Sequence, residues 1–365
     1  MKRWLARRSR DARPTTSHQL NVLSWPAYLA REANPYTSLL CDSMVRSGAE
    51  VAEFSARRAL SGDYRIWHIH WPERALVAAS FPQMLVKCGI FGALIPLSRL
   101  RGARIVWTVH NLRSHERAQP KLERVMMWWF TRQLSGFIAL SPSGLEAAQE
   151  RYPSLARARS VVIPHGHYLD VYPNTVERDE ARQRLGVESS ECVFLFFGQL
   201  RAYKNASRLL QAFAELKSLS ACLIVAGQPA SAEIADDLRR LAAMDARVRL
   251  DLVRIPDDQI QIYMNAADLV VLPYVDVLNS GTAILALSFG RPVLVPHLGA
   301  MGDLQALFGA DAVRTYDGQI SPKILADAVG TSSDSAALRR FVRRQLDWDA
   351  IGRQTVAFYE QIASG

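Results

Sequence analysis

Two loops in the second half of the chain carry groups that suit a diphosphate. The first, Gly198–Asn205, follows an apolar run and carries Arg201 and Lys204 three residues apart. Gly198 permits a tight turn, and two neighbouring cations offset the charge of a diphosphate that would otherwise need a metal. An ordinary strand–helix loop with two solvated cations could have the same sequence, so this loop alone does not establish a diphosphate-binding site.

The second loop, Tyr274–Thr282, also lies between an apolar run and a predicted helix. Asn279 or Ser280 can cap that helix, and Gly281 lets the backbone N–H groups near Thr282 face an anion. The N-terminus of a helix adds about half a positive charge. Simple capping would need no ligand, but two such loops at strand C-termini of one domain favour a shared anionic ligand.

Seven of the eight histidines precede residue 170, and several stand where a predicted strand ends. His68, His70, His110 and His165 are of this kind, and strand C-termini are the functional edge of a parallel sheet. His68 and His70 share one face of a strand, so one or both can be core residues. Metal ligands would come from different strands with no spacing to enforce a site, so we expect neither a metal nor a cofactor.

Glu73 follows Pro72 at the end of an apolar run. A buried carboxylate destabilises the folded protein unless it forms an ion pair or hydrogen bonds, so a carboxylate at this position suggests either a partner or a catalytic role. It is a candidate general base, or an ion-pair partner of Arg74 or Arg113. Glu116 is a second candidate base, and the sequence does not separate the two.

Short apolar runs alternate with amphipathic stretches along the whole chain, which is typical of parallel sheets covered by helices on both faces. The predicted strands are Asn21–Trp25, Glu50–Ser55, Ile66–Trp71, Arg104–Val109, Phe137–Leu140, Ser160–Ile163, Cys192–Phe197, Cys222–Ala226, Val248–Val253, Leu269–Leu272 and Val293–Val295. The main predicted helices are Tyr36–Ser47, Leu76–Leu100, Pro120–Leu134, Ser143–Tyr152 and Ala283–Phe289. We expect an α/β protein with two Rossmann-like domains whose parallel sheets face a central cleft.

The composition along the chain suggests five segments. These are a basic N-terminal extension (1–18), an N-terminal Rossmann-like domain (19–170), a polar linker (171–190), a C-terminal Rossmann-like domain (191–335) and a C-terminal helix (336–365).

A set of short motifs recurs in a fixed order from about residue 20 to about residue 355. They are Asn34–Tyr36, His68–Glu73, Thr108–Leu112, His115–Glu116, His165–Tyr168, Phe197–Lys204, Asn279–Thr282 and Leu285–Val293. Together they resemble the GT-B glycosyltransferases and, more narrowly, the bacterial GDP-mannose-dependent β-1,4-mannosyltransferases of xanthan-type exopolysaccharide assembly. Each motif alone is weak, whereas the ordered set is specific for the fold.

The resemblance implies a nucleotide-sugar donor, with GDP-mannose expected, and a lipid-diphosphate-linked saccharide as acceptor, without a required metal. It implies that residues 19–170 form the acceptor-binding domain, that residues 191–335 form the nucleotide-sugar-binding domain, and that the C-terminal helix (336–365) packs back towards the N-terminal domain. On the donor side it implies His165, Gly198, Arg201, Lys204, Arg254, Asn279, Ser280, Gly281 and Thr282. On the acceptor side the candidates are Asn34, Tyr36, His70, Asn111 and Glu116. Nothing near Arg254 identifies the nucleotide base.

Retaining members of the larger GT-B family usually carry two glutamates eight positions apart around the second loop. This chain has Val277 and Leu285 at those positions, which favours an inverting transfer. Inversion requires a base that takes the proton of the acceptor hydroxyl. We expect Glu73 in this role first and His110 second. A UDP-sugar donor, a retaining mechanism, or an epimerase or hydrolase on the same fold are the alternatives.

The charge is divided unevenly between the two halves. Residues 1–170 hold 24 Lys and Arg against 12 Asp and Glu, a net charge of +12, whereas residues 171–365 carry a net charge of −3. Nucleic acid, an anionic membrane or a phosphorylated substrate would each explain this division. The cations are scattered and no nucleic-acid-binding motif is present, so we keep a basic nucleic-acid-binding protein only as the alternative of a different class.

Membrane contact is expected to be peripheral. The longest uninterrupted apolar run, Cys88–Leu97, has ten residues, whereas about 20 are needed to span a bilayer. Residues 1–13 carry six cations and one acid. In Pro120–Leu134 a core-facing apolar stripe is formed by Leu122, Val125, Met126 and Trp129, whereas Met127 and Trp128 fall off it. A wide buried face would explain these two residues equally well. We expect a cytoplasmic protein on the inner face of the cell membrane, and four cysteines without CxxC spacing agree with a reducing compartment.

Overall fold

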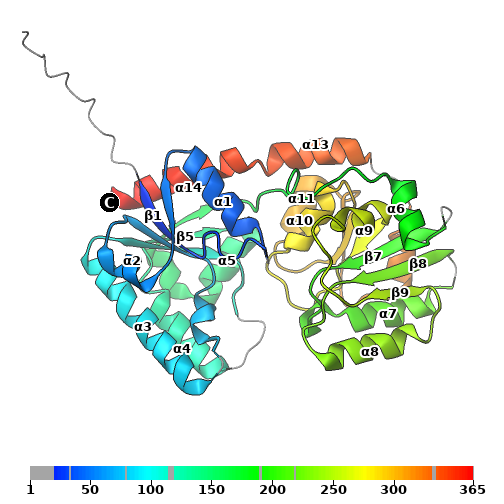
Figure 1. Cartoon of the computed structure of the whole chain (residues 1–365), viewed down its shortest axis with the longest axis horizontal. Helices are drawn as coiled ribbons and strands as arrows, with labels where there is room; N and C mark the ends of the chain where they lie inside the picture. The colour runs from blue at the N-terminus through cyan, green and yellow to red at the C-terminus, as the bar shows by residue number, and fades with distance from the viewer. Residues whose placement is uncertain are drawn as a thin grey trace, which may run out of the picture.

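Two parallel sheets form the two lobes of the molecule (Figure 1). The computed structural model describes residues 20–32, 34–78, 80–113, 119–188, 191–217, 219–330 and 334–364. In spatial order the N-terminal sheet contains β2 (Glu50–Glu53), β1 (Asn21–Trp25), β3 (Ile66–Ile69), β4 (Arg104–Val109), β5 (Gly136–Ala139) and β6 (Arg159–Val162). The C-terminal sheet contains β12 (Val313–Tyr316), β11 (Val293–Pro296), β10 (Leu269–Val271), β7 (Cys192–Phe197), β8 (Ala221–Ala226) and β9 (Val248–Asp251).

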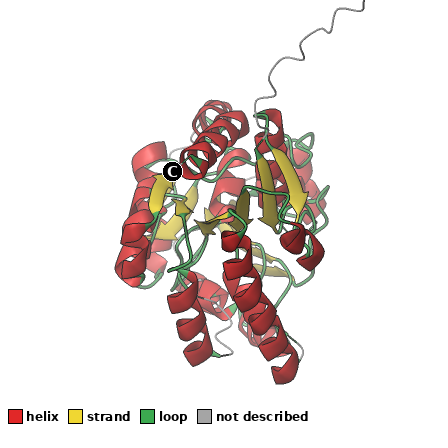
Figure 2. Ribbon diagram, turned by 90° about the vertical axis from the view of Figure 1, so that its left-hand side faces the viewer, coloured by secondary structure: helices red, strands yellow, loops and turns green. Residues whose placement is uncertain are grey.

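Helices cover both faces of each sheet, as the side view shows (Figure 2). The N-terminal domain has α1 (Tyr36–Arg46), α2 (Ala56–Ser61), the 3-10 helix η1 (Pro72–Leu76), α3 (Phe81–Leu100), α4 (Pro120–Phe130), α5 (Pro142–Arg151) and the 3-10 helix η2 (Pro153–Arg157). The C-terminal domain has α6 (Arg178–Leu185), the 3-10 helix η3 (Ala202–Lys204), α7 (Ala206–Glu215), α8 (Ala232–Ala242), α9 (Ile260–Ala266), α10 (Gly281–Ser288), α11 (Met301–Phe308) and α12 (Pro322–Asp327). The predicted α/β architecture is thus confirmed.

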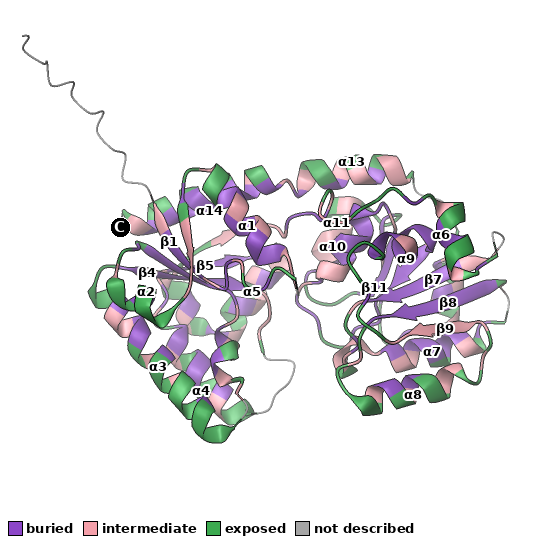
Figure 3. Ribbon diagram, viewed as in Figure 1, coloured by how far each residue is buried: buried purple, intermediate pink, exposed green. Residues whose placement is uncertain are grey.

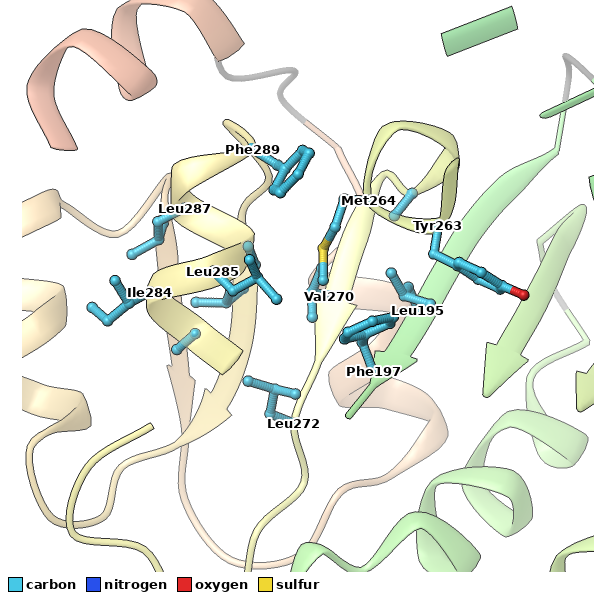
Figure 4. Packing of buried hydrophobic residues seen from close by; sticks show 14 of the residues in the cluster. Leu195, Phe197, Tyr263, Met264, Val270, Leu272, Ile284, Leu285, Leu287 and Phe289 are labelled. Carbon is cyan, nitrogen blue, oxygen red and sulfur yellow. The ribbon is translucent and has the colours of Figure 1, made fainter. Parts of the chain in front are cut away.

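Strand β7 shows why a run with no polar interruption becomes a central strand. Val193, Leu195 and Phe197 point to one face of the sheet and join one core cluster. Phe194 and Phe196 point to the other face and join a second cluster. Because both faces of a parallel sheet are covered by helices, neither set can be polar. Figure 4 shows the first of these cores, in which side chains of α10 pack against β10 and β7.

The C-terminal segment forms two helices where the sequence predicted one. α13 (Ser335–Gln345) packs on the C-terminal domain through Leu338 and Val342, and α14 (Trp348–Ala363) packs on α1 of the N-terminal domain. The break falls at Asp347, whose carboxylate accepts a hydrogen bond from the backbone N–H of Ala350 and so caps α14. The two helices bridge both lobes along one side (Figure 1).

The segment predicted as a linker also contains structure. Residues 178–185 form α6, which packs on α9, and its Arg182 is buried in an ion pair with Asp268 at 2.6 Å. The charged composition of residues 171–190, with three Arg against four Asp and Glu, did not indicate this burial, because the sequence does not distinguish a paired arginine from a solvated one. Strand β12 was missed for a related reason: Arg314 and Thr315 interrupt its apolar pattern at the edge of the sheet.

Two expectations about apolar surface need correction. Met127 is buried in the core of the N-terminal domain, so it cannot contact lipid, whereas Trp128 beside it is exposed. Val125, which the predicted stripe placed in the core, is also exposed. Among the described residues, one helix, α3, is long and apolar enough to cross a membrane on length and composition alone, although the chain has no apolar run of that length.

Candidate active site

A cavity of about 780 Å³ lies between the two domains, at the C-terminal edges of both sheets. Most of the predicted site residues line it: Asn34, Tyr36, Glu73, His110, Asn111, His165, Arg201, Lys204, Asn279, Ser280, Gly281 and Thr282. Strand order explains the convergence, because the loops that follow β3, β4 and β6 meet those that follow β7 and β10 across the cleft.

The cations of the C-terminal wall come from the loop between β7 and α7. Gly198 has a φ of +106°, and a Cβ there would lie 3.3 Å from Thr282 Oγ1 and 3.5 Å from Lys204 Nζ. The Lys204 ammonium is therefore held between the two predicted loops. Burial and the neighbouring Arg201 lower the pKa of Lys204 to about 8. No ion pair with a carboxylate is formed by Lys204 within the described ranges, so an anion bound here would stabilise its charged form and raise its pKa.

The N-terminus of α10 completes this wall. Ser280 Oγ accepts a hydrogen bond from the backbone N–H of Ala283 and caps the helix. The preceding N–H groups, at Gly281 and Thr282, belong to the first turn, which has no intrahelical acceptors. They border the same cavity as Lys204, so the helix end and the cation face one volume.

The side chain of Asn279 does not cap α10, which the sequence allowed, but contacts the backbone of the N-terminal domain. Its amide donates to the carbonyl oxygen of His110 at 3.2 Å and lies 3.5 Å from that of Val109, both on the opposite domain. Asn279 therefore ties the anion-binding loop to the end of β4 while its backbone stays in the cavity wall.

Glu73 lies on the opposite wall, in η1 directly after β3. It is the one carboxylate among the described residues that line the cavity. Burial, with a smaller contribution from the nearby carboxylate of Glu123, raises the pKa of Glu73 to about 7. A carboxylate with this pKa is partly ionised near neutral pH and is basic enough to accept a proton from a hydroxyl group during a reaction.

The histidines around the cavity are neutral, because burial lowers the pKa of each well below its ordinary value. His70 Nδ1 lies 3.1 Å from His110 Nε2, and the His110 ring stacks on Trp71 at 4.6 Å. His165 Nδ1 lies 2.7 Å from the carbonyl oxygen of Gly166. Since a carbonyl only accepts, His165 carries its proton on Nδ1 and presents Nε2 as an acceptor.

His68 has no access to the cavity. Its ring is buried, with Nε2 2.7 Å from Thr108 Oγ1 and Nδ1 2.7 Å from the hydroxyl of Tyr359 on α14. His68 is thus a core residue, as the sequence allowed, and it joins the C-terminal helix to the N-terminal sheet.

Three of the predicted residues that the structure describes do not line the cavity. His70 is buried behind His110, and Gly198 lies under Lys204. Arg254 reaches across to the backbone of the other domain, where its guanidinium donates to the carbonyl oxygen of Glu32 at 2.6 Å. Glu116 lies outside the described residues, as does the basic extension of residues 1–18.

Other lining residues were not predicted, among them Trp71, Lys87, Gln199, Tyr203 and Tyr274. Lys87 gave a signal that could have been used, since it is the one charge in the first 18 residues of the apolar helix α3. No cluster of three or more potential metal ligands occurs in the part of the chain that the structure describes.

Comparison with known proteins agrees with this arrangement. Residues 191–328 match the family described as group 1 glycosyl transferases. A GDP-mannose:glycolipid 4-beta-D-mannosyltransferase of Xanthomonas campestris is 28% identical over 320 residues, which cover 88% of this chain and 86% of that protein. A D-inositol 3-phosphate glycosyltransferase of Corynebacterium urealyticum is 24% identical over 67% of this chain and 61% of its own length.

Solved structures show the same fold at low identity. Sucrose-phosphate synthase from Thermosynechococcus elongatus superposes with a TM-score of 0.71 at 17% identity, over 95% of this chain and 100% of that one. HepE of Anabaena, solved in complex with UDP-glucose, has a TM-score of 0.67 at 16% identity, over 94% of this chain and 100% of that one. The chain is a glycosyltransferase with the GT-B fold, and residues 191–328 of its C-terminal domain match the group 1 glycosyl transferases.

Proposed function

We propose that the protein transfers mannose from GDP-mannose to a lipid-diphosphate-linked oligosaccharide, with inversion at the anomeric carbon, as a step of exopolysaccharide synthesis. The observation that carries the proposal is the division of one cavity. Arg201, Lys204 and the N-terminus of α10 line one wall, and Glu73 is the carboxylate of the other. The similarity to the GDP-mannose:glycolipid 4-beta-D-mannosyltransferase of Xanthomonas campestris supports this donor and a glycolipid acceptor.

The C-terminal wall is suited to the leaving diphosphate. When the bond between C1 of the sugar and the β-phosphate oxygen breaks, the electron pair leaves with the diphosphate. Lys204, Arg201 and the N–H groups at Gly281 and Thr282 lie where they stabilise this charge. The fixed cations need no reorganisation as the charge develops.

Glu73 is the proposed base. As the acceptor oxygen attacks C1, its proton passes to the Glu73 carboxylate. With a pKa of about 7, the carboxylate is ionised in a large fraction of molecules near neutral pH and still basic enough to take the proton.

The contact between His70 and His110 argues against His110 as the base. One proton lies between His70 Nδ1 and His110 Nε2. If His110 supplied it, the proton of His70 would be on Nε2, which is buried with no partner among the described residues. Buried N–H groups without an acceptor are rarer than buried acceptors without a donor. His70 is therefore the better donor, and His110 keeps its own proton on Nδ1.

The inverting mechanism is supported by what replaces the two glutamates of retaining relatives. Leu285 packs in the core between α10 and β10, where Figure 4 shows it facing Val270, and Val277 borders the cavity. Neither side chain can act as a nucleophile. Proton NMR of the freshly formed product tests this point, with a β-linked mannose from the α-linked donor as the expected result.

Donor identity is tested by calorimetry with GDP, UDP and ADP, followed by transfer of labelled mannose into a lipid fraction. We expect GDP to bind most tightly and label from GDP-mannose to enter the lipid. A preference for UDP would instead favour the UDP-sugar alternative. Binding of double-stranded DNA in the presence of competitor, without transfer, would favour the nucleic-acid alternative.

The proposed place of the reaction is the inner face of the cell membrane. The net charge of +12 in residues 1–170 supports attraction to anionic lipid, and a glycolipid acceptor would have to be met there. Fractionation of cells producing the protein tests this placement, with the protein expected in the membrane fraction and released by salt in part.

A further inference from the structure

Helix α3 leaves much of its apolar surface uncovered. Phe81, Leu85, Val86 and Ile90 are each between 47% and 60% exposed, and only 28% of the helix's most apolar stretch is buried. The exposed turns are visible along α3 in Figure 3. An apolar area of this kind on a protein surface marks an interaction site.

The opposite side of α3 is anchored in the protein. Met84, Phe91, Leu94 and Ile95 are buried, and the last three join the core cluster of the N-terminal sheet. Because this side is needed for folding, α3 stays on the domain and cannot leave it to cross a bilayer. Its exposed side can only lie against a surface.

The charges around the apolar side have one sign. Every exposed charged residue of α3 and of its neighbour α4 is a cation: Lys87, Arg99, Lys121 and Arg124. The single acid of the two helices, Glu123, is buried. The ring centres of Phe91 on α3 and Trp129 on α4 lie 6.4 Å apart, so the two helices form one side of the domain (Figure 1).

Helix α4 contributes a tryptophan and a cation at its exposed end. Trp128 is 57% exposed, and the guanidinium of Arg132 lies 3.8 Å from its ring centre. Tryptophan and arginine together are typical of the boundary between apolar and polar layers of a bilayer, because each has an apolar body and a polar end.

This side of the domain continues into the cavity. Lys87 Nζ donates to the carbonyl oxygen of Val77 at 2.8 Å, and both residues line the cavity that holds Glu73. Val77 is itself exposed. The apolar side of α3 and the mouth of the cavity therefore share residues.

We propose that the exposed side of α3, with Val125 and Trp128 of α4, docks on an anionic lipid leaflet and opens the cavity at Val77 and Lys87 towards that leaflet. The role of this docking in catalysis rests on the proposed function, transfer to a lipid-linked acceptor. The acceptor saccharide then reaches Glu73 while its lipid stays in the bilayer. Basic residues attract the leaflet, and the apolar side chains insert below the headgroups.

Vesicle flotation tests the docking without any donor or acceptor, so its outcome is independent of the proposed reaction. The full chain is mixed with vesicles of phosphatidylcholine and phosphatidylglycerol at low and at high salt. High salt screens attraction by cations alone, including those of residues 1–18, but leaves apolar insertion. The test variant is Leu85→Gln, Val86→Gln, Ile90→Gln, and the control is Met244→Gln, Val253→Gln, at exposed positions of the C-terminal domain.

We expect the wild type and the control to remain partly bound at high salt, and the triple variant to bind at least about tenfold more weakly. Circular dichroism checks that all three are folded. Equal binding by the triple variant, or complete release of the wild type by salt, would overturn the proposal. So would a wild-type dimer that the triple variant turns into a monomer while vesicle binding is unchanged, because α3 would then be covered by a second copy.

Discussion

The two walls of the cavity hold charge in opposite ways. On the C-terminal wall, Arg201 and Lys204 are cations placed beside a helix N-terminus, and the described residues of that wall that line the cavity include no Asp or Glu. On the N-terminal wall, His110 and His165 are held neutral by burial, and the pKa of Glu73 is raised to about 7. The C-terminal wall therefore presents positive charge to the cavity, whereas on the N-terminal wall the histidines stay neutral and Glu73 can gain or lose a proton near neutral pH.

This difference assigns the two parts of the reaction to different domains. A leaving diphosphate needs charge that is present throughout the reaction, whereas the attacking hydroxyl needs a group whose charge changes during it. Substitutions on the C-terminal wall should therefore change donor affinity, and substitutions on the N-terminal wall should change turnover. The following experiments test that separation.

The largest effect is expected for Glu73→Gln. Loss of the base should lower kcat by about 10²- to 10⁴-fold, while GDP affinity in calorimetry stays unchanged. In the wild type, kcat/KM should rise with pH and level off above a midpoint near 7, because the base works in its ionised form.

Glu123→Gln is the matched control for this prediction. It removes the neighbouring carboxylate that helps to raise the pKa of Glu73, so activity should persist and the midpoint should move to lower pH. If the midpoint of the pH profile is the same in Glu123→Gln as in the wild type, and Glu73→Gln turns over at a near-normal rate, then Glu73 is not the group that causes the pH dependence.

Arg201→Ala should weaken GDP binding at least about tenfold, because a charge-assisted hydrogen bond contributes about 1.5–3 kcal/mol. At saturating donor, kcat should change much less than after Glu73→Gln. Isothermal calorimetry measures the affinity of the variant and of the wild type for GDP. Unchanged affinity would remove Arg201 from the diphosphate site.

Lys204→Met should act in opposite directions on binding and on stability. The folded-state pKa of Lys204 is lowered to about 8, so its charged form is destabilising in the free protein below that pH. The variant should thus have a higher Tm than the wild type at pH 7, a difference that shrinks as the pH rises from about 8 towards 10.5, yet bind GDP more weakly. A lower Tm without ligand at pH 7 would contradict the proposed cost of the ammonium.

His70→Phe tests the proton between the two histidines. In the wild type, nitrogen-15 NMR of histidine-labelled protein should show His110 with its proton on Nδ1. In the variant, His110 should no longer prefer the proton on Nδ1. The kcat of the variant should fall about three- to tenfold, which is the effect expected from losing a hydrogen bond of about 0.5–1.5 kcal/mol. A wild-type His110 protonated on Nε2 would make it available as a base and reopen the choice against Glu73.

The smallest effect is expected for Asn279→Ala, which removes the side-chain hydrogen bond from the C-terminal loop to the His110 carbonyl. We expect a rise of about two- to threefold in KM for the donor, with kcat nearly unchanged, because the bond is partly exposed and single. Steady-state kinetics distinguish this from a phosphate contact, whose loss would weaken GDP binding as strongly as Arg201→Ala.

Much of the C-terminal wall could be predicted because its signals are local. Gly198, Arg201 and Lys204 lie within seven residues, and Ser280 caps the helix that it precedes. The positive φ of Gly198 follows from the turn that the chain must make between β7 and α7. Such features need no knowledge of distant residues.

The N-terminal wall depends on contacts far apart in the sequence, and the sequence described it less well. The position of His70 behind His110 follows from the pairing of β3 with β4, which brings two separate strand ends together. Arg254 was expected at the donor, but its guanidinium bonds to the other domain. Helical spacing alone placed Val125 in the core, because it does not show which part of a wide apolar stripe the neighbouring helix covers.

The most direct test of the account is the transfer of radiolabelled mannose from GDP-mannose into a lipid-diphosphate-linked acceptor by the wild type and by Glu73→Gln, assayed side by side with GDP binding. The account predicts labelled lipid with the wild type, at least about a hundredfold less with the variant, and equal GDP affinity for both. Near-normal label with Glu73→Gln, or binding and transfer lost together, would contradict the division of labour between the two walls.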